Sequence, residues 1–261
     1  MKINIEYDSH KYEIDSDNGV DISIPVKFNE DENPKFYDTS NPKKHYYESA
    51  GVEYNINMGA GCSVPLVTMN IHCSGTHTET ANHVIKNAPT ISDIKKINFI
   101  PSQLISIAPE QGTNEGYHSN INESDWVITK NNLMKSLNNI DDFIDSLIIR
   151  TLPNEENKKI KNYNSGDHPF LSNEAISFLK SIGIKHIVID TPSIDKFDDG
   201  GKLGNHKIFF TNDDKSTNKN TVTELAFIPN HCVDGIYLLC IGVPNFKLDA
   251  APSRPIIYKI K

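Results

Sequence analysis

Ligand-type side chains are densest at positions 72–83, where the sequence reads HCSGTHTETANH. Side chains of an extended backbone alternate between two faces, so His77 and Glu79 would point to the same side. Gly75 gives the backbone freedom to turn just before them. Such a turn followed by His-x-Glu could present an imidazole nitrogen and a carboxylate oxygen to one zinc or manganese ion.

His83 stands four residues after Glu79 and has a different prospective role. If the chain becomes helical there, His83 comes one turn later, near the metal but free for acid–base work. An imidazole that titrates near neutral pH suits that role. The alternative for His83 is a hydrogen bond that supports a metal ligand. For the whole run, the alternative is a strand end that carries surface histidines.

The elements that must position these residues are mostly short strands. Alternating or β-branched patterns predict strands at residues 20–28, 52–58, 64–71, 103–107, 146–151, 186–191, 223–228, 235–243 and 256–260. Helices are predicted at 130–137 and 173–182, the second capped by Ser172 and closed by Gly183. Strands come first and then mix with a few helices, which predicts a mixed α/β or α+β domain rather than a doubly wound parallel sheet.

Composition excludes several classes of function. The 261 residues include 26 Lys and Arg against 34 Asp and Glu, a formal charge of −8, which argues against nucleic-acid binding and against docking on an anionic membrane. We expect no transmembrane helix and no signal peptide. The four cysteines lack a disulfide framework spacing, so we expect a reduced, cytoplasmic protein. The absence of G-x-G-x-x-G and G-x-S-x-G motifs argues against nucleotide binding and serine-hydrolase chemistry.

The 72–83 run resembles the signature of the cyclase family of metal-dependent hydrolases, which includes bacterial kynurenine formamidase and isatin hydrolase. The usual form of that signature is H-x-G-T-H-x-D-x-P-x-H. Four positions are kept in register: Gly75, Thr76, His77 and His83. Spacing and resemblance therefore agree that His77 is a metal ligand.

The sequence departs from that signature at three positions. Glu79 replaces the aspartate and, being one methylene longer, could still bridge two metal ions with altered geometry. Ala81 replaces the proline, and Cys73 stands at the first histidine position, one residue after His72. A branch of the family is similar in reading P-H-x-x-G-T-H-T-E, which favours His72 as the first ligand, displaced through a bulge. The Cys73 thiolate, also a good zinc ligand, is the alternative.

Other segments extend the resemblance in the expected order, from about residue 20 to the C-terminus. Residues 167–195 are similar to the family's helix–strand–D-T-P-S-x-D segment, and DAAPSR resembles its terminal D-G-x-P-x-R segment. The GNHKIFF stretch resembles the one that supplies a metal-binding histidine, here His206. The TELAFIP stretch resembles the strand whose glutamate closes the second metal position, here Glu224. Alone, His206 would be interpreted as a loop residue, and Glu224 as an outward-facing strand residue.

The resemblance implies a swivelling β/β/α fold, formed as a single domain over residues 1–261, and homodimers or larger homo-oligomers. It implies hydrolysis of a C–N amide bond in a small molecule, as in an arylformamidase (kynurenine formamidase) of tryptophan catabolism. A metal-activated water would attack the carbonyl, and His83 would pass a proton to the leaving amine. One or two divalent ions, zinc first and manganese second, would be held by His72, His77, Glu79, His206 and Glu224.

Three alternatives remain open. The same site could open a cyclic amide or an ester, the fold could be kept in a binding protein that has lost turnover, or the role could be purely structural. Outside the ligand set, Asp190, Ser193 and Asp195 are interpreted as loop architecture. Arg254 is interpreted as a partner of Asp249 or of a substrate carboxylate, a surface ion pair being the commoner arrangement.

Overall fold

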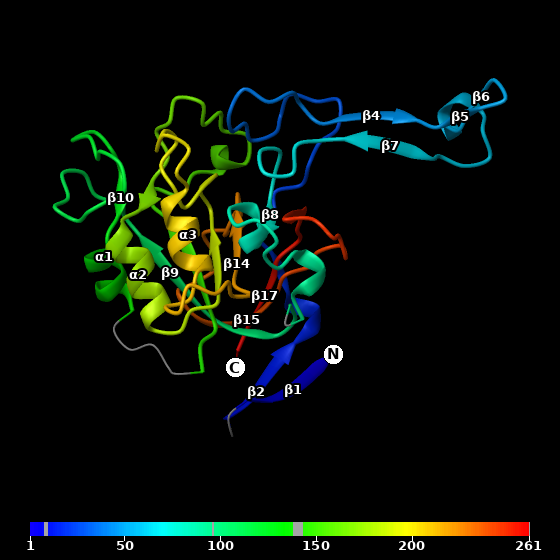
Figure 1. Cartoon of the computed structure of the whole chain (residues 1–261). Coiled ribbons are helices and arrows are strands. Elements are labelled where there is room, and N and C mark those ends of the chain that lie inside the picture. Colours follow the sequence, from blue (N-terminus) through cyan, green and yellow to red (C-terminus); the bar gives the residue numbers. More distant parts are fainter. Residues whose placement is uncertain (8–9, 96, 138–142, 261) are drawn as a thin grey trace.

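A nine-stranded sheet runs through the computed structural model, which describes residues 1–7, 10–95, 97–137 and 143–260 (Figure 1). From one edge to the other it comprises β16 (Ala250–Pro252), β8 (His77–Glu79), β14 (Thr221–Glu224), β13 (His186–Ile189), β11 (Ser146–Thr151), β9 (Ile100–Ile107), β15 (Gly235–Cys240), β17 (Ile256–Lys259) and β3 (Val20–Asp21). The strands β14, β13, β11 and β9 are parallel to one another, and the other described pairings within this sheet are antiparallel. The sheet is therefore mixed, as the sequence predicts.

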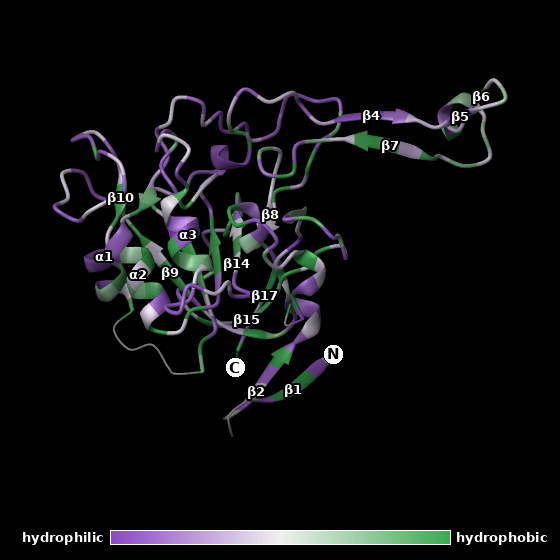
Figure 2. Cartoon of the chain, viewed as in Figure 1, coloured by the Kyte–Doolittle hydropathy of each residue, from purple (hydrophilic) through white to green (hydrophobic). Residues whose placement is uncertain are grey.

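The central strands are buried on both faces, and hydrophobic residues predominate along them (Figure 2). One face, with Ile105, Leu147 and Ile187, packs against three helices, α1 (Lys130–Ser136), α2 (Asn173–Ser181) and α3 (Gly204–Phe210). The alternate residues of the same strands form a second core with β15 and β17. Successive side chains of each strand therefore pack into opposite hydrophobic cores, which is typical of parallel strands covered on both sides.

The helices differ in how far the sequence predicts them. In α2, Ser172 caps the first turn through its hydroxyl oxygen and Gly183 follows the last turn at φ 85°, so the prediction for this helix is confirmed. The prediction for α1 is also confirmed. The sequence patterns do not predict α3, whose N–H groups of Asn205 and His206 donate to the side chain of Asp195, while that of Gly204 donates to His118 Nε2.

Two predicted strands of the sheet, at 20–28 and 223–228, end four or more residues before their predicted ends. In the stretch 20–28 only β3 forms, because the Asp21 side chain accepts the N–H and the hydroxyl of Ser23 and turns the chain. In the stretch 223–228 the strand ends at Glu224. Leu225 follows with φ 51°, a left-handed conformation that a strand cannot continue.

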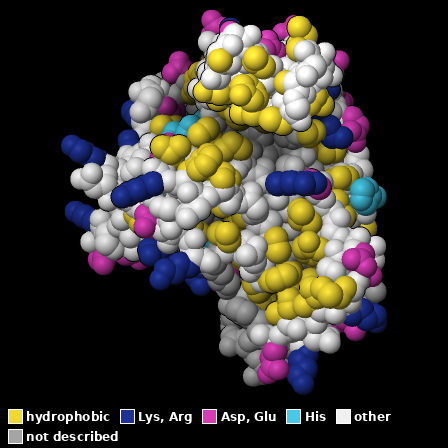
Figure 3. Space-filling model, turned by 90° about the vertical axis from the view of Figure 1, so that its right-hand side faces the viewer, with side chains coloured by type: hydrophobic (Ala, Val, Ile, Leu, Met, Phe, Trp, Pro, Cys, Tyr) yellow, Lys and Arg dark blue, Asp and Glu magenta, His cyan; other side chains and the backbone are white. Residues whose placement is uncertain are grey.

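The predicted strands 52–58 and 64–71 lie outside the sheet. Here β4 (Lys43–Tyr46) and β7 (Pro65–Thr68) pair into a long hairpin that carries β5 (Glu48–Ser49) and β6 (Val52–Glu53) at its far end (Figure 1). We call residues 43–68 the arm. Its exposed hydrophobic side chains are Tyr47, Val52, Ile56, Met58, Val64, Leu66 and Val67. Figure 3 shows hydrophobic side chains gathered in the upper part of the molecule.

Two further strand pairs complete the fold. At the N-terminus β1 (Lys2–Tyr7) pairs with β2 (His10–Asp15), and beside the helices β10 (Val127–Ile128) pairs with β12 (Phe170–Leu171). Within the described residues, each helix is too short or too polar to cross a membrane.

Candidate metal centre

The short strand β8 places two predicted ligands on one face of the sheet. Thr78 points the other way, its hydroxyl 2.7 Å from that of Thr223, so His77 and Glu79 share the opposite face. Both are fully buried. Antiparallel pairing sets Glu224 of β14 opposite His77, with Nε2 of the histidine 3.5 Å from Oε2 of the glutamate. The extended geometry predicted for this run is therefore present.

The helix α3 brings His206 to the same cluster. The Asp195 carboxylate accepts the backbone N–H groups of Asn205 (2.9 Å) and His206 (3.2 Å), and lies 2.7 Å from His206 Nδ1. His206 Nε2 is 3.4 Å from Glu224 Oε1 and also contacts Glu79 Oε1. Asp195, interpreted from the sequence as architecture alone, is thus also the residue that orients a candidate ligand.

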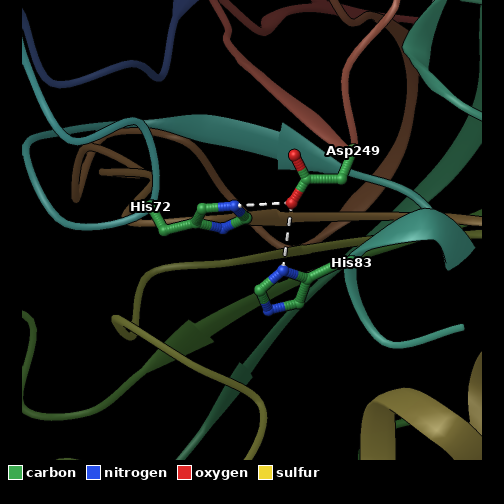
Figure 4. Close-up of side chains that lie close together, drawn as sticks. All are labelled: His72, His83 and Asp249. Carbon is green, nitrogen blue, oxygen red and sulfur yellow. Dashed lines mark hydrogen bonds and ion pairs between the residues drawn. The ribbon is translucent and has the colours of Figure 1, made fainter. Parts of the chain in front are cut away.

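Asp249 links His72 and His83 at the less buried side of the cluster (Figure 4). Its Oδ2 is 3.0 Å from His72 Nε2 and 3.2 Å from His83 Nδ1. Toward the cluster, His72 Nδ1 is 3.1 Å and His83 Nε2 is 3.6 Å from Glu79 Oε2. His83 ends the 3-10 turn Ala81–His83, so the helical turn considered after Glu79 is present.

The three candidate ligand histidines share one arrangement of their ring nitrogens. Nδ1 of His77 faces a backbone carbonyl oxygen at 3.1 Å, and one nitrogen each of His72 and His206 faces a carboxylate. An N–H donated to these outer oxygens leaves the other nitrogen of each ring with a lone pair directed at a buried glutamate. Metal-binding histidines usually show this arrangement.

These inner atoms form two groups that share Glu79. His72, His77 and Glu79 make one group, and Glu79, His206 and Glu224 make the other; within each, the ligand atoms lie within 4.8 Å of one another. Among the described residues, four buried ligand atoms have no hydrogen-bond partner: His77 Nε2, His206 Nε2 and both carboxylate oxygens of Glu79. Buried polar atoms are normally satisfied, so this donor set fits one or two divalent ions, which these residues would hold with Glu79 as a candidate ligand in both groups.

The charges of the cluster point the same way. Burial opposes ionisation of Glu79, but the attraction of His206 and His83 holds its pKa well below the usual range. Burial and the nearby Glu79 oppose ionisation of Glu224, yet the adjacent imidazoles of His206 and His77 keep its pKa lowered. The carboxylates in turn raise the pKa of His206 against its burial. The cluster draws positive charge, which protons or a divalent cation can supply.

A further group of ligand-type residues, His118, Asp195 and Asp199, differs from this cluster. Both ring nitrogens of His118 are engaged, Nδ1 with Asn173 Oδ1 at 3.2 Å and Nε2 with Asp199 Oδ2 at 2.9 Å. Asp199 also accepts the N–H of Leu203. With its atoms already hydrogen-bonded to neighbouring groups, this set of residues has the character of a hydrogen-bond network rather than a ligand set.

Two alternatives left open by the sequence can be compared with the geometry. Cys73 packs against Phe36 and Leu225, and burial raises the pKa of its thiol to about 11. It belongs to none of the ligand groups of the described residues, whereas His72 does. Arg254 does not pair with Asp249. Its Nε is 2.7 Å from Asp21 Oδ2, and the Asp249 carboxylate faces the histidines instead.

The cluster lines a cavity of about 370 Å³. Its other walls include Phe36, Tyr37 and Phe197, with the Tyr37 and Phe197 rings stacked at a centroid distance of 5.0 Å. The sequence offers no local signal for these wall residues, because Tyr37 and Phe197 meet across 160 positions. The same holds for Asp249, which lies 166 positions from His83.

The fold and the clustered ligands define a mixed α/β protein with a candidate metal centre at one side of its sheet. Residues 20–196 match the model of the family described as "Putative cyclase". The chain therefore belongs to this cyclase family, as its motifs suggest. A comparison with curated proteins gives no match.

Solved structures share the fold at low sequence identity. A "predicted metal-dependent hydrolase from Bacillus stearothermophilus" is 17% identical, with a TM-score of 0.62 over 92% of this chain and 98% of that chain. An isatin hydrolase bound to the product analogue thioisatinate is 13% identical, with a TM-score of 0.66 over 94% of this chain and 93% of that chain. Isatin hydrolase A from Labrenzia aggregata is 15% identical, with a TM-score of 0.61 over 92% and 93%. These likenesses confirm the predicted fold.

Proposed function

We propose that this protein is a metal-dependent hydrolase that cleaves the C–N bond of a small-molecule amide. The proposal is carried by the two ligand groups that share Glu79, in which four buried ligand atoms lack a hydrogen-bond partner among the described residues. A purely structural cluster would leave these atoms unsatisfied at a cost in free energy. A structural neighbour named as a predicted metal-dependent hydrolase also supports the proposed hydrolase function.

The ligand set divides between two positions. His72, His77 and Glu79 would hold one ion, and Glu79, His206 and Glu224 would hold a second. Zinc is the first choice because imidazole and carboxylate both suit it, and manganese is the second. When bound, such an ion supplies Lewis acidity, which polarises a carbonyl oxygen and lowers the pKa of water toward about 7.

His83 is the proposed catalytic acid–base residue. Its side chain is 22% exposed and lines the cavity, so it is accessible to a substrate. With the Nδ1–H donated to Asp249, Nε2 is the atom that can take a proton and release it to the leaving amine. Asp249 would hold His83 in the tautomer and ring orientation that this transfer needs.

An aryl formamide is the substrate we propose, as in an arylformamidase. The aromatic wall formed by Phe36, Tyr37 and Phe197 supports a substrate with a ring next to the amide. A cyclic amide is the second candidate, because isatin hydrolases are among the structural neighbours. Either substrate requires attack on an amide carbonyl and protonation of the departing nitrogen.

We also propose that the protein forms a homodimer or a larger homo-oligomer. The seven exposed hydrophobic side chains of the arm support this, because an apolar surface of that kind is typical of a protein contact. The four cysteines are free thiols, which supports a location in the reducing cytoplasm.

Metal content tests the proposed function. We expect one or two equivalents of zinc or manganese in the purified protein by mass spectrometry, and their loss in His77→Ala and in Glu79→Ala. His118→Ala is the matched control, because it removes an imidazole from the satisfied network beside the cluster and should leave the metal in place.

Turnover completes the test. The metal-loaded protein should hydrolyse N-formylkynurenine or isatin, with loss of activity in both metal-free variants. A wild-type protein that contains no metal and takes up no added zinc would overturn the proposal. A protein that binds metal and hydrolyses neither substrate would instead support a binding protein that has lost turnover.

A further inference from the structure

The part of the cavity wall beyond the proposed ligands combines aromatic rings with acidic groups. Phe36, Tyr37 and Phe197 form one aromatic cluster, with ring centroids 4.3 Å, 5.0 Å and 5.6 Å apart. Asp198 and Asp199 line the same cavity. Among the described residues, no lysine or arginine does so. The non-reacting part of a substrate would therefore meet rings and carboxylates and no fixed cation.

The lysines of the adjoining loop are held away from this wall. Lys196 pairs with Asp125, and its Nζ also donates to the carbonyl oxygen of Asn120 at 3.0 Å. Lys202 Nζ donates to the carbonyl oxygen of His118 at 2.8 Å. Both lysines thus have partners on the 117–125 segment rather than in the cavity.

The two arginines of the sequence are engaged as well. Arg150 lies 3.0 Å from Asp234 and also donates to two backbone carbonyl oxygens, and Arg254 lies 2.7 Å from Asp21. Arginine is the side chain that best recognises a carboxylate, through paired N–H donors. The cavity has no such clamp.

Asp198 is the carboxylate of this wall that remains available. It is exposed, and in the described part of the chain the only group that donates to it is the Gly200 N–H, at 3.2 Å. Asp199 is buried and already accepts from Leu203 and faces His118. A charged substrate group at the cavity mouth would therefore interact chiefly with Asp198 and the aromatic faces.

We propose that this cavity selects aromatic amides whose ring carries a neutral or cationic substituent and discriminates against an anionic one. The inference rests on the proposed hydrolase function and narrows its substrate class. An ammonium group gains attraction from Asp198 and from the faces of Tyr37 and Phe197. A carboxylate in the same place loses water against the aromatic wall, meets a like charge, and finds no lysine or arginine among the described lining residues.

Three formanilides of matched shape test this selection. Their para substituents are 2-aminoethyl, 2-hydroxyethyl and carboxymethyl, which differ in charge and all carry their polar atoms on the second carbon from the ring. We expect kcat/KM of the metal-loaded enzyme to be about tenfold lower for the anion than for the neutral compound. The kcat/KM for the cationic compound should equal or exceed that for the neutral compound. N-Formylkynurenine is unsuitable here because it carries both charges.

Asp198→Lys should shift the ratio of anion to cation toward the anion by about three- to fivefold or more, as expected for a charge at an exposed position. Asp213→Lys is the matched control. It makes the same change of charge on the exposed 211–217 loop, where Asp213 pairs with Lys180 outside the cavity, and should leave the ratio unchanged.

Binding provides a readout that does not need turnover. The three corresponding acetanilides, titrated into the metal-loaded protein by calorimetry, should follow the same order of affinity. If no formanilide is hydrolysed, the proposed aryl formamide substrate fails while the affinities still test the selection. The proposed selection would be overturned if the anionic compound bound as tightly as the neutral one and if the order of the three affinities were unchanged in Asp198→Lys.

Discussion

Glu79 and Asp190 are both completely buried carboxylates beside the same sheet, yet their surroundings differ. Asp190 accepts the N–H and the hydroxyl of Thr151, at 3.0 Å and 2.9 Å, and an N–H of Lys158 at 2.8 Å. Both oxygens of Glu79 lack a hydrogen-bond partner in the described chain, although three histidines surround them. The satisfied carboxylate is architecture, whereas the unsatisfied one has the character of a metal ligand.

The presence of a nearby cavity does not distinguish the surroundings of Glu79 from those of Asp190. Asp190 and Lys158 line a cavity of about 330 Å³, close in size to the one beside Glu79. The direction of the pKa shift does distinguish the two carboxylates. Burial raises the pKa of Asp190 in spite of Lys158, while several histidines hold that of Glu79 low in spite of burial. A functional carboxylate is therefore better recognised by its missing partners and surplus of imidazoles than by its position in a pocket.

The largest effect is expected for Glu79→Gln, which keeps the shape of the side chain and removes the shared negative charge. We expect both ligand groups to fail, with loss of bound metal and a fall in kcat/KM of about a thousandfold or more. Metal analysis and kinetics on the same preparation check this. Full metal content in Glu79→Gln would show that Glu79 resembles Asp190 more than the geometry suggests.

The opposite outcome is expected for Asp190 and Lys158, because the carboxylate of Asp190 already has its hydrogen-bond partners. Lys158→Met leaves Asp190 buried without its cation, which should lower the free energy of unfolding by about 3–5 kcal/mol. Metal content should stay at the wild-type level. Urea unfolding of the metal-loaded protein measures the free energy of unfolding, and mass spectrometry measures the metal content. The double variant Lys158→Met/Asp190→Asn is the control, and should recover part of the lost stability because no buried charge remains.

The sequence could predict the part of the site that depends on local periodicity. His77 and Glu79 share a face because strand side chains alternate, and His83 follows in a helical turn. It could not predict that Asp249 faces His83, since that contact depends on the pairing of β16 with β8. The same reason explains the missed helix α3, whose start is fixed by Asp195 rather than by its own residues.

A smaller effect is expected for Asp195→Asn, which acts through His206. The amide would still accept one hydrogen bond but would hold the ring less firmly, and we expect metal affinity to fall about 10- to 100-fold. Competition with a chromophoric chelator measures this. Asp199→Asn is the matched control, since Asp199 faces His118 instead of a candidate ligand. Equal losses in the two variants would contradict a specific role for Asp195.

The metal-free protein should lose stability as pH rises. Burial opposes protonation of His72, but the nearby carboxylates of Asp249 and Glu79 raise its pKa to about 10 from 6.5. A raised folded-state pKa contributes stability below pH 6.5 that is lost progressively toward pH 10. Between pH 6.5 and 9 we expect a loss of about 3 kcal/mol in urea unfolding. In the metal-loaded protein His72 would bind as neutral imidazole, so a similar loss there would argue against His72 as a ligand.

The smallest effect is expected at Arg254, which the sequence associated with Asp249 or with a substrate carboxylate. In the structure it pairs at the surface with Asp21, and its own side chain is 73% exposed. We therefore expect Arg254→Ala to change Tm by about 2 °C or less. Because Arg254 does not line the cavity, the ratio of kcat/KM between the carboxymethyl and hydroxyethyl formanilides should also stay unchanged. A further loss confined to the anion would mean that Arg254 leaves Asp21 to meet the substrate, and the cavity would then possess the cation that its walls lack.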